Sequence, residues 1–274
     1  AVGQDSLSRD YNDQLQRIAP QDPQSALQQF EIAEGLKIEL VACEPMICDP
    51  VAITFDEFGR AYVVEMRGYS ERTDQLLGRI KILEDSDQDG QFDRATVFAE
   101  GFRWPTAVVC AFGGILVGDA PDIIFLRDLN DDGTADVRQI LLTGFGTSNV
   151  QQLPNNFQWG IDNRIYGSSG GNGGRILRTD VPQGTLPANI SWGPQPPIDV
   201  RGRDFAINPA DLSLIAISGG SQFGMTFDRF GTRFVCSNSN HCQQVILQEN
   251  YAVRNQRQPI SSSSVNIAAD GPAA

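Results

Sequence analysis

The sequence predicts an all-β fold of the β-propeller type, and three observations support it. From Leu36 onward, short alternating apolar runs are separated by turns rich in Gly, Asp and Asn, which is typical of strands and hairpins. One phrase, consisting of an apolar strand, a turn and a second apolar strand, occurs four times. Two acidic loops of one pattern also lie 43 positions apart between short apolar runs, which indicates a repeated structural unit.

Residues 1–35 are predicted to form an N-terminal arm with a short helix. The first part is polar and rich in turn residues. Pro23–Phe30 begins with proline and places Leu27 and Phe30 near one face, so we expect a helix with both side chains inward. Strands are expected at 37–41, 51–55, 61–64, 80–83, 108–110, 115–117 and 123–126.

The recurring phrase predicts propeller blades over residues 36–274. Its copies are residues 55–63, 109–117, 159–166 and 227–235, and their central Gly or Asn residues are 54, 50 and 68 positions apart. Four-stranded blades repeat at about 40–50 residues, so the chain is expected to cover four to five blades and to leave the ring incomplete at its C-terminal end. The Gly-rich stretch 167–174 and the Pro-rich stretch 182–197 are expected to be surface loops.

The two acidic loops predict calcium sites. Oxygen side chains occupy relative positions 1, 3, 5 and 9, glycine occupies position 6, and the carbonyl of position 7 is expected to turn inward. The first set is Asp85, Asp87, Asp89 and Asp93 with the Gln91 carbonyl, and the second is Asp128, Asn130, Asp132 and Asp136 with the Thr134 carbonyl. Position 12 is not Glu in either loop, so these are not EF-hands, and Asp93 and Asp136 are expected to supply the late ligand. The alternative is a solvated Asp-Gly turn between strands.

Charge and cysteine content narrow the range of partners and compartments. The net charge of −13 and the pI near 4.4 argue against nucleic acid and against an anionic membrane surface. No apolar run approaches the ~20 residues of a membrane span. Cys43/Cys48 and Cys236/Cys242 could form short-loop disulfides or cross-pair, with Cys110 left over. Calcium loops with these cysteines favour a periplasmic, extracellular or cell-surface location, and no Cys-x-x-Cys haem motif is present.

Several longer motifs resemble a known family. They are Asp49–Asp56, Tyr62–Arg67, Gly78–Asp85, Asp199–Phe205, Ser218–Gly224 and Ser237–His241. Over about residues 24–274 the chain resembles the N-terminal domain of the membrane-bound dehydrogenases of planctomycetes and their relatives, also called haem-binding Cys-x-x-Cys-His proteins. The resemblance implies a six-bladed propeller of the soluble quinoprotein glucose dehydrogenase superfamily, often followed by helical repeats and a cytochrome c module.

The resemblance also implies where chemistry would lie. In quinoprotein dehydrogenases a histidine takes the hydroxyl proton of a sugar or alcohol while hydride passes to pyrroloquinoline quinone, and His241 is the one histidine of this chain. The candidates for binding the quinone are Arg67, Arg201, Arg203, Gln222 and Asn240. The alternative role of these arginines is ion pairing between blades, with Glu65 and Asp204 as partners.

Three functions remain open on the sequence. The first is a calcium-binding, quinone-linked sugar or alcohol dehydrogenase domain that passes electrons to a cytochrome. The second is a non-catalytic, calcium-stiffened propeller that binds carbohydrate or protein. The third is a lactonase-type hydrolase with a calcium ion in the channel. The first predicts Arg and His side chains converging on a flat cavity, the second predicts no such convergence, and the third requires carboxylates that converge in the channel.

Overall fold

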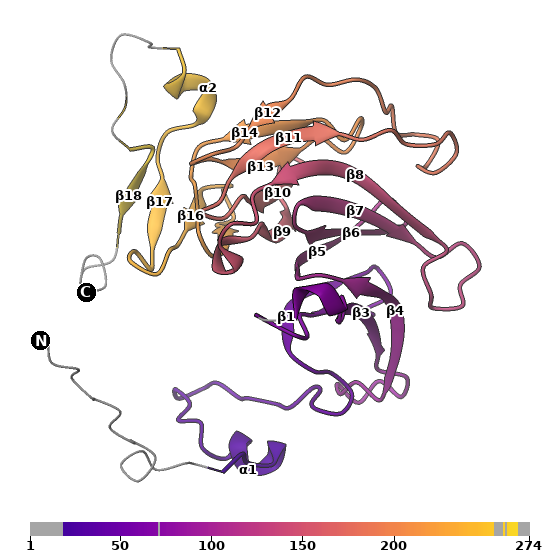
Figure 1. Ribbon diagram of the computed structural model, residues 1–274. Helices are drawn as coiled ribbons and strands as arrows, with labels where there is room; N and C mark the ends of the chain where they lie inside the picture. The colour runs from indigo at the N-terminus through magenta and orange to yellow at the C-terminus, as the bar shows by residue number, and fades with distance from the viewer. Residues whose placement is uncertain (1–18, 71, 255–259, 261, 268–274) are drawn as a thin grey trace, which may run out of the picture.

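The chain folds into four antiparallel β-sheets with very little helix (Figure 1). The structure is a computed structural model, and it describes residues 19–70, 72–254, 260 and 262–267. The helices are α1 (Pro23–Leu27), α2 (Glu249–Ala252) and the short 3₁₀ turns η1 (Thr73–Gln75) and η2 (Val150–Gln152). None of the helices in this described part is long and apolar enough to cross a membrane.

The first two sheets run up and down in chain order. The first consists of β1 (Pro50–Phe55), β2 (Ala61–Glu65), β3 (Gly78–Glu84) and β4 (Arg94–Phe102). The second consists of β5 (Pro105–Ala111), β6 (Gly114–Asp119), β7 (Asp122–Arg127) and β8 (Val137–Phe145), and it is extended by β11 (Gly174–Arg178) and β12 (Ile198–Asp199). These two later strands pair onto the outer edge of the sheet, so that it has six strands.

The third and fourth sheets have four strands each. The third is ordered β14 (Leu214–Ile217), β13 (Asp204–Ile207), β10 (Ile165–Ser168) and β9 (Asn155–Trp159). The fourth is ordered β15 (Met225–Phe227), β16 (Arg233–Val235), β17 (Gln243–Val245) and β18 (Ser264–Asn266). Each of the four recurring phrases of the sequence is the first hairpin of a different sheet, β1–β2, β5–β6, β9–β10 or β15–β16. The predicted strand–turn–strand repeat is therefore confirmed.

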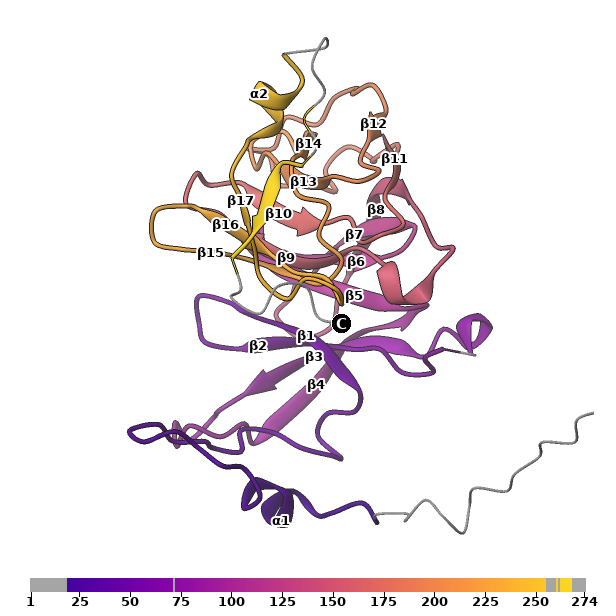
Figure 2. The same ribbon diagram turned by 90° about the vertical axis from the view of Figure 1, so that its left-hand side faces the viewer.

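The sheets follow one another with their first strands adjacent. β5 contacts both β1 and β9. Side chains of β9 reach β15, because the amides of Asn156 and Gln158 each donate to the Met225 carbonyl at 2.7 Å. The first strands of the four sheets, β1, β5, β9 and β15, are thus neighbours in that order. In both views α1 lies beyond the first sheet, on the side away from the second and third sheets (Figures 1 and 2). The described strands do not close into a ring, and the six-bladed propeller stays a prediction.

Two large apolar clusters hold the sheets together. One lies between the first and second sheets and includes Ile80, Phe98 and Leu126. The other joins the second and third sheets and includes Phe145 and Phe205, whose rings are 5.3 Å apart. The inner strands β3, β7 and β13 are buried along nearly their whole length, whereas the outer strand β4 alternates buried and more exposed positions. The inner strands are therefore covered on both faces by neighbouring parts of the fold.

The structure differs from the sequence predictions at three places. The helix ends at Leu27, and Phe30 is 59% exposed instead of pointing inward. Residues 37–41, predicted as a strand, have no strand partner among the described residues. The Gly-rich stretch 167–174 is largely buried and contributes to β10 and β11, because its glycines admit neighbouring backbone: a Cβ on Gly170 would lie 2.2 Å from the Gln152 carbonyl oxygen.

Candidate functional site

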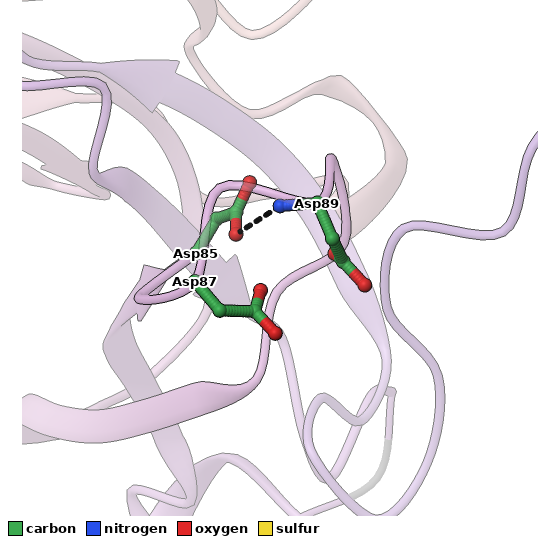
Figure 3. Close-up of side chains that lie close together, drawn as sticks. All are labelled: Asp85, Asp87 and Asp89. Atoms are coloured by element: carbon green, nitrogen blue, oxygen red, sulfur yellow. Dashed lines mark hydrogen bonds between the residues drawn. The ribbon is translucent and has the colours of Figure 1, made fainter.

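The first acidic loop, Asp85–Asp93, joins β3 to β4 and gathers three carboxylates. Oxygens of Asp85, Asp87 and Asp89 all lie within 4.8 Å of one another. Figure 3 shows the three side chains close together on the same loop. Oxygens that share one calcium ion at 2.3–2.6 Å are at most about 5 Å apart. The spacing of these carboxylates therefore fits a calcium-sized cation.

Three internal hydrogen bonds are common to both acidic loops. The carboxylate at position 1 accepts from the glycine N–H at position 6, and the carboxylate at position 5 accepts from the N–H at position 7. The carboxylate at position 9 accepts from the N–H at position 2. In the first loop the donors and acceptors are Gly90 to Asp85 (2.9 Å), Gln91 to Asp89 (2.8 Å) and Ser86 to Asp93 (3.1 Å). In the second they are Gly133 to Asp128 (2.8 Å), Thr134 to Asp132 (2.8 Å) and Leu129 to Asp136 (2.7 Å).

The backbone of the two loops is matched as well. Position 4 is left-handed in both, with φ of 60° at Gln88 and 58° at Asp131. Position 6 is also left-handed, with φ of 92° at Gly90 and 84° at Gly133, a conformation that glycine adopts without steric cost. Two different sequences therefore reach one loop geometry, in which the backbone turns the acidic side chains to one side.

The predicted late ligands hold the loops closed instead of joining the cluster. Asp93 accepts hydrogen bonds from the Ser86 hydroxyl at 2.5 Å and from the Ser86 N–H, and these bonds hold the pKa of Asp93 below its usual value. Asp136 accepts from the Leu129 N–H in the equivalent way. The structure thus brings together three of the four side chains predicted for the first loop. Asp93 would have to rotate away from Ser86 to ligate.

The second loop, Asp128–Asp136, joins β7 to β8 and carries less charge at its centre. Asn130 replaces a carboxylate, and its amide donates to Asp132 at 3.2 Å. Desolvation raises the pKa of Asp128, but hydrogen bonds from the N–H groups of Gly133, Asn130 and neighbouring residues outweigh it and leave that pKa lowered. The carboxylate is accordingly held ionised by the loop backbone.

Each loop is anchored to the structural element that precedes its sheet. The residue at position 8 is Phe92 in the first loop and Ala135 in the second, and each packs its apolar side chain against a buried cluster. The Phe92 N–H donates to the Val41 carbonyl at 3.0 Å, and the Ala135 N–H donates to the Phe98 carbonyl of β4 at 2.9 Å. The acidic loops therefore connect neighbouring parts of the fold as well as neighbouring strands.

A cavity of about 740 Å³ lies between the third and fourth sheets. Its walls come from β10, β14, the β15–β16 hairpin, the end of β17 and the start of α2. The rings of Tyr166 and Phe227 meet edge to face with centroids 4.9 Å apart. Phe230, at the tip of the hairpin, is 72% exposed. The cavity thus has an aromatic wall that is open to solvent on one side.

The charges at the rim of this cavity occur in pairs. Asp162 lies 3.6 Å from Arg164 and accepts a hydrogen bond of 2.9 Å from the Tyr166 hydroxyl. Burial, followed by this hydrogen bond, raises the pKa of Tyr166 to about 12. On the opposite side Glu249 pairs with Arg203 at 3.0 Å and accepts from the Ser218 hydroxyl at 3.3 Å. The rim therefore offers hydrogen-bonding groups without a net charge.

A buried ion pair lies at the base of the cavity. Arg233 lines the cavity and is 8% exposed, and its Nη1 lies 3.9 Å from Oδ2 of the fully buried Asp204. Burial lowers the pKa of Arg233 and raises that of Asp204, while the attraction between the two opposes both shifts. Asp204 also accepts from the Ser221 hydroxyl and N–H at 2.9 and 3.0 Å. This pair fixes the fourth sheet against the third.

The six residues predicted for quinone chemistry do not share a described cavity. His241 and Asn240 lie on the loop between β16 and β17, where His241 is exposed, and Gln222 approaches that loop by accepting from the Asn238 N–H at 3.3 Å. The others lie elsewhere: Arg201 is exposed and paired with Asp199, Arg203 is paired with Glu249, and Arg67 follows β2 in the first sheet. Neither of the two described cavities is lined by any of the six.

The expected ion-pair partners of those arginines are also different. Buried Glu65 pairs with Arg79 and with Lys81, the latter at 3.5 Å, and Asp204 pairs with Arg233. Sequence reasoning missed the cavity residues Asp162, Tyr166, Arg233 and Glu249. One indication for Arg233 was present in the sequence, because a charged residue next to the apolar residues of the last recurring phrase needs a partner if it is buried. The other contacts join segments far apart in the sequence, which no local pattern predicts.

Comparisons with known proteins give a family and little more. Residues 22–273 match the model of a family described as a domain of unknown function, DUF7133, and the chain belongs to that family. A comparison with curated proteins finds no match. Among solved structures, one titled as a streptogramin B lyase structure is similar over 76% of this chain and 68% of that chain, with 14% sequence identity and a TM-score of 0.40. So weak a likeness carries no argument about fold or activity.

Proposed function

We propose that this chain is a calcium-binding β-sheet domain of the propeller type that binds a carbohydrate between its third and fourth sheets, outside the cytoplasm. The observation that carries the calcium part is the matched geometry of the two acidic loops, which share hydrogen bonds and left-handed positions although their residues differ. A solvated Asp-Gly turn needs no cluster of three carboxylates, and such a cluster is repulsive without a cation.

Calcium would be held by Asp85, Asp87 and Asp89 in the first loop and by Asp128, Asn130 and Asp132 in the second. The backbone carbonyls of Gln91 and Thr134 and the carboxylates of Asp93 and Asp136 are the further proposed ligands. Bound calcium neutralises the carboxylates and fixes the loops, whose anchors tie the first and second sheets to the elements before them. Its proposed role is structural. Since millimolar calcium lies outside the cytoplasm, a weak site of this type fits a periplasmic or extracellular protein.

The cavity between the third and fourth sheets supports the carbohydrate part. Its volume of about 740 Å³ is in the range of pockets for small molecules. A ligand with many hydroxyl groups can donate to Asp162 and Glu249 and accept from Arg164 and Ser218, because a hydroxyl both donates and accepts. The apolar face of a sugar ring can pack against Tyr166 or Phe227. Because the charged groups of the rim are paired, a neutral ligand fits better than an anion.

Isothermal titration calorimetry tests the two parts separately. Calcium binding should be lost from the first loop in Asp85→Asn and retained in Asp180→Asn, whose exposed carboxylate lies outside both loops. Carbohydrate binding, screened with neutral mono- and oligosaccharides, should weaken about tenfold or more in the double variant Asp162→Asn/Glu249→Gln, since a hydrogen bond to a charged group contributes about 1.5–3 kcal/mol. Equal affinity of the double variant and Asp180→Asn for every bound sugar would refute the cavity assignment.

A quinone-linked sugar or alcohol dehydrogenase is the second candidate, and one observation favours it. Gln222, Asn240 and His241 gather at one end of the fourth sheet. These three residues line neither of the two described cavities. Dye-linked sugar oxidation by protein supplied with calcium and pyrroloquinoline quinone tests the reading. Activity that disappears in His241→Ala, with calcium binding intact, would support it over the binding module.

A further inference from the structure

Two cysteines face each other across the β16–β17 hairpin. The register pairs Phe234 with Gln244 and Val235 with Gln243. Continued by one residue, it places Cys236 directly opposite Cys242. Directly opposite residues of antiparallel strands have their side chains on the same face of the sheet. The two cysteines, both free and both half-buried in this structure, therefore lie on the same face of the hairpin, where the Cys236 thiol donates to the Phe223 carbonyl.

The hydrogen bonds show which kind of cross-strand pair this is. The Cys236 carbonyl accepts from the N–H groups of Gln222 and Phe223, on the β15 side. The Cys242 carbonyl accepts from the Ile267 N–H at 3.2 Å, on the β18 side. Both carbonyls thus point away from the space between β16 and β17. Cys236 and Cys242 form a non-hydrogen-bonded pair, the pair whose Cα atoms approach to about 4.5 Å.

This backbone register suits a disulfide once the Cys236 side chain turns from the Phe223 carbonyl toward Cys242. Disulfide-linked residues have Cα atoms about 4.4–6.8 Å apart with their Cβ atoms facing each other. Burial, and then the neighbouring Cys242, raises the pKa of Cys236. Cys43 and Cys48 do not share this arrangement, because they lie at the two ends of a turn closed by Met46 and Ile47 N–H bonds to the Cys43 carbonyl.

We propose that Cys236 and Cys242 form a thiol modification site, oxidised by a small-molecule disulfide to an intramolecular disulfide that closes the loop carrying Asn240 and His241. One cysteine thiolate attacks a sulfur atom of the oxidant, which breaks the S–S bond of the oxidant, forms a mixed disulfide and releases one thiol. The second cysteine thiolate then attacks the sulfur of the first cysteine, which breaks the mixed disulfide, forms the Cys236–Cys242 bond and releases the second thiol. Two cysteine hydrogens leave as protons, and two electrons reduce the external disulfide to two thiols.

The cross-link acts on a loop that hydrogen bonds already constrain, one of them from the Asn240 N–H to the Ser237 hydroxyl at 3.1 Å. The Ser237 N–H donates to the Asn240 carbonyl at 2.8 Å, and the Asn238 N–H donates to the Gln222 side chain at 3.3 Å. A bond between Cys236 and Cys242 would hold the base of the loop while these hydrogen bonds hold its tip. Oxidation would thus fix His241 relative to Gln222. This inference rests neither on calcium binding nor on the carbohydrate cavity.

Mass spectrometry of the whole chain tests the proposal directly. The protein is equilibrated with oxidised glutathione and calcium, treated with an alkylating reagent and digested with trypsin. One tryptic peptide, Phe234–Arg254, contains both cysteines and neither of the other pair. We expect it unalkylated and lighter by two hydrogen atoms after oxidation, and doubly alkylated after reduction. Hydrogen exchange of the loop amides should slow by about tenfold on oxidation.

Matched variants separate this outcome from non-specific oxidation. Cys43→Ser/Cys48→Ser should leave the cross-link unchanged, whereas Cys236→Ser should leave Cys242 free to alkylate or capped by glutathione. If the variant lacking Cys236 does not fold, the wild-type peptide map alone decides the matter. Separate glutathione adducts on Cys236 and Cys242, or a disulfide from either one to Cys43, Cys48 or Cys110, would overturn the proposal.

Discussion

Removal of calcium should destabilise the domain by an amount that can be worked out. The structure offers two loops of the same geometry, so two ions are expected per chain. Extracellular calcium sites have dissociation constants of about 0.1–1 mM. At ten times the dissociation constant, one site contributes RT ln 11, or about 1.4 kcal/mol, and two sites contribute about 3 kcal/mol. For a domain of this size that corresponds to a Tm lower by about 6–12 °C in chelator.

The assay is thermal unfolding followed by circular dichroism, in excess calcium and in excess chelator. Asp85→Asn and Asp128→Asn should each remove about half of the difference, because each loop contributes separately. The surface variant Asp180→Asn should keep the full difference. Magnesium should restore little of it, because that ion demands near-octahedral geometry and dehydrates reluctantly. A Tm that does not change between calcium and chelator would refute the reasoning for both loops at once.

Three further predictions follow from individual side chains. Asn130→Asp should tighten calcium binding at the second loop about tenfold in calorimetry, because an added carboxylate at the cluster raises the affinity of such a loop; an unchanged affinity would argue that position 3 does not ligate. Gly170→Ala should lower the free energy of unfolding by more than about 2 kcal/mol in urea titration, because its Cβ would overlap the Gln152 carbonyl and its φ is +65°. Tyr166 should ionise at about pH 12, two units later than a free tyrosine, in a titration of tyrosinate absorbance. Its pKa is raised in the folded state, so its contribution to stability is complete below about pH 10 and is lost as the pH rises through about 12; replacing Asp162 with Ala should advance the ionisation.

The parts of the fold that sequence patterns predicted are those set by neighbours in the chain. A hairpin depends on apolar alternation and a turn residue within about ten positions, and all four recurring phrases became first hairpins. The acidic loops were predictable for the same reason, since their geometry is set by Asp, Asn and Gly side chains bonding to nearby amides. Calcium itself stays a prediction.

What the sequence did not predict depends on partners far along the chain. β11 lies in sequence between strands of the third sheet, but it pairs with β8 of the second sheet. No local sequence pattern predicts this pairing. Gly170 is buried against the Gln152 carbonyl of η2. Arg203 forms an ion pair with Glu249, which lies 46 positions later in the chain. The quinone-binding set was drawn from a family resemblance, which gives residue types but not their distances.

The acidic loops and the sheet order are connected by one repeated contact. In the second loop the Ala135 N–H bonds to Phe98 in the outer strand of the first sheet. In the first loop the Phe92 N–H makes the same bond to Val41, although no sheet precedes β1 among the described residues. Residues around Val41 therefore stand where an outer strand of a preceding sheet would stand, which explains why Lys37–Val41 reads as a strand and yet lacks a strand partner. A calcium ion in each loop would then stiffen the contact between that loop's sheet and the segment before it, and this shared position is a reason for one loop pattern to recur in the first two sheets.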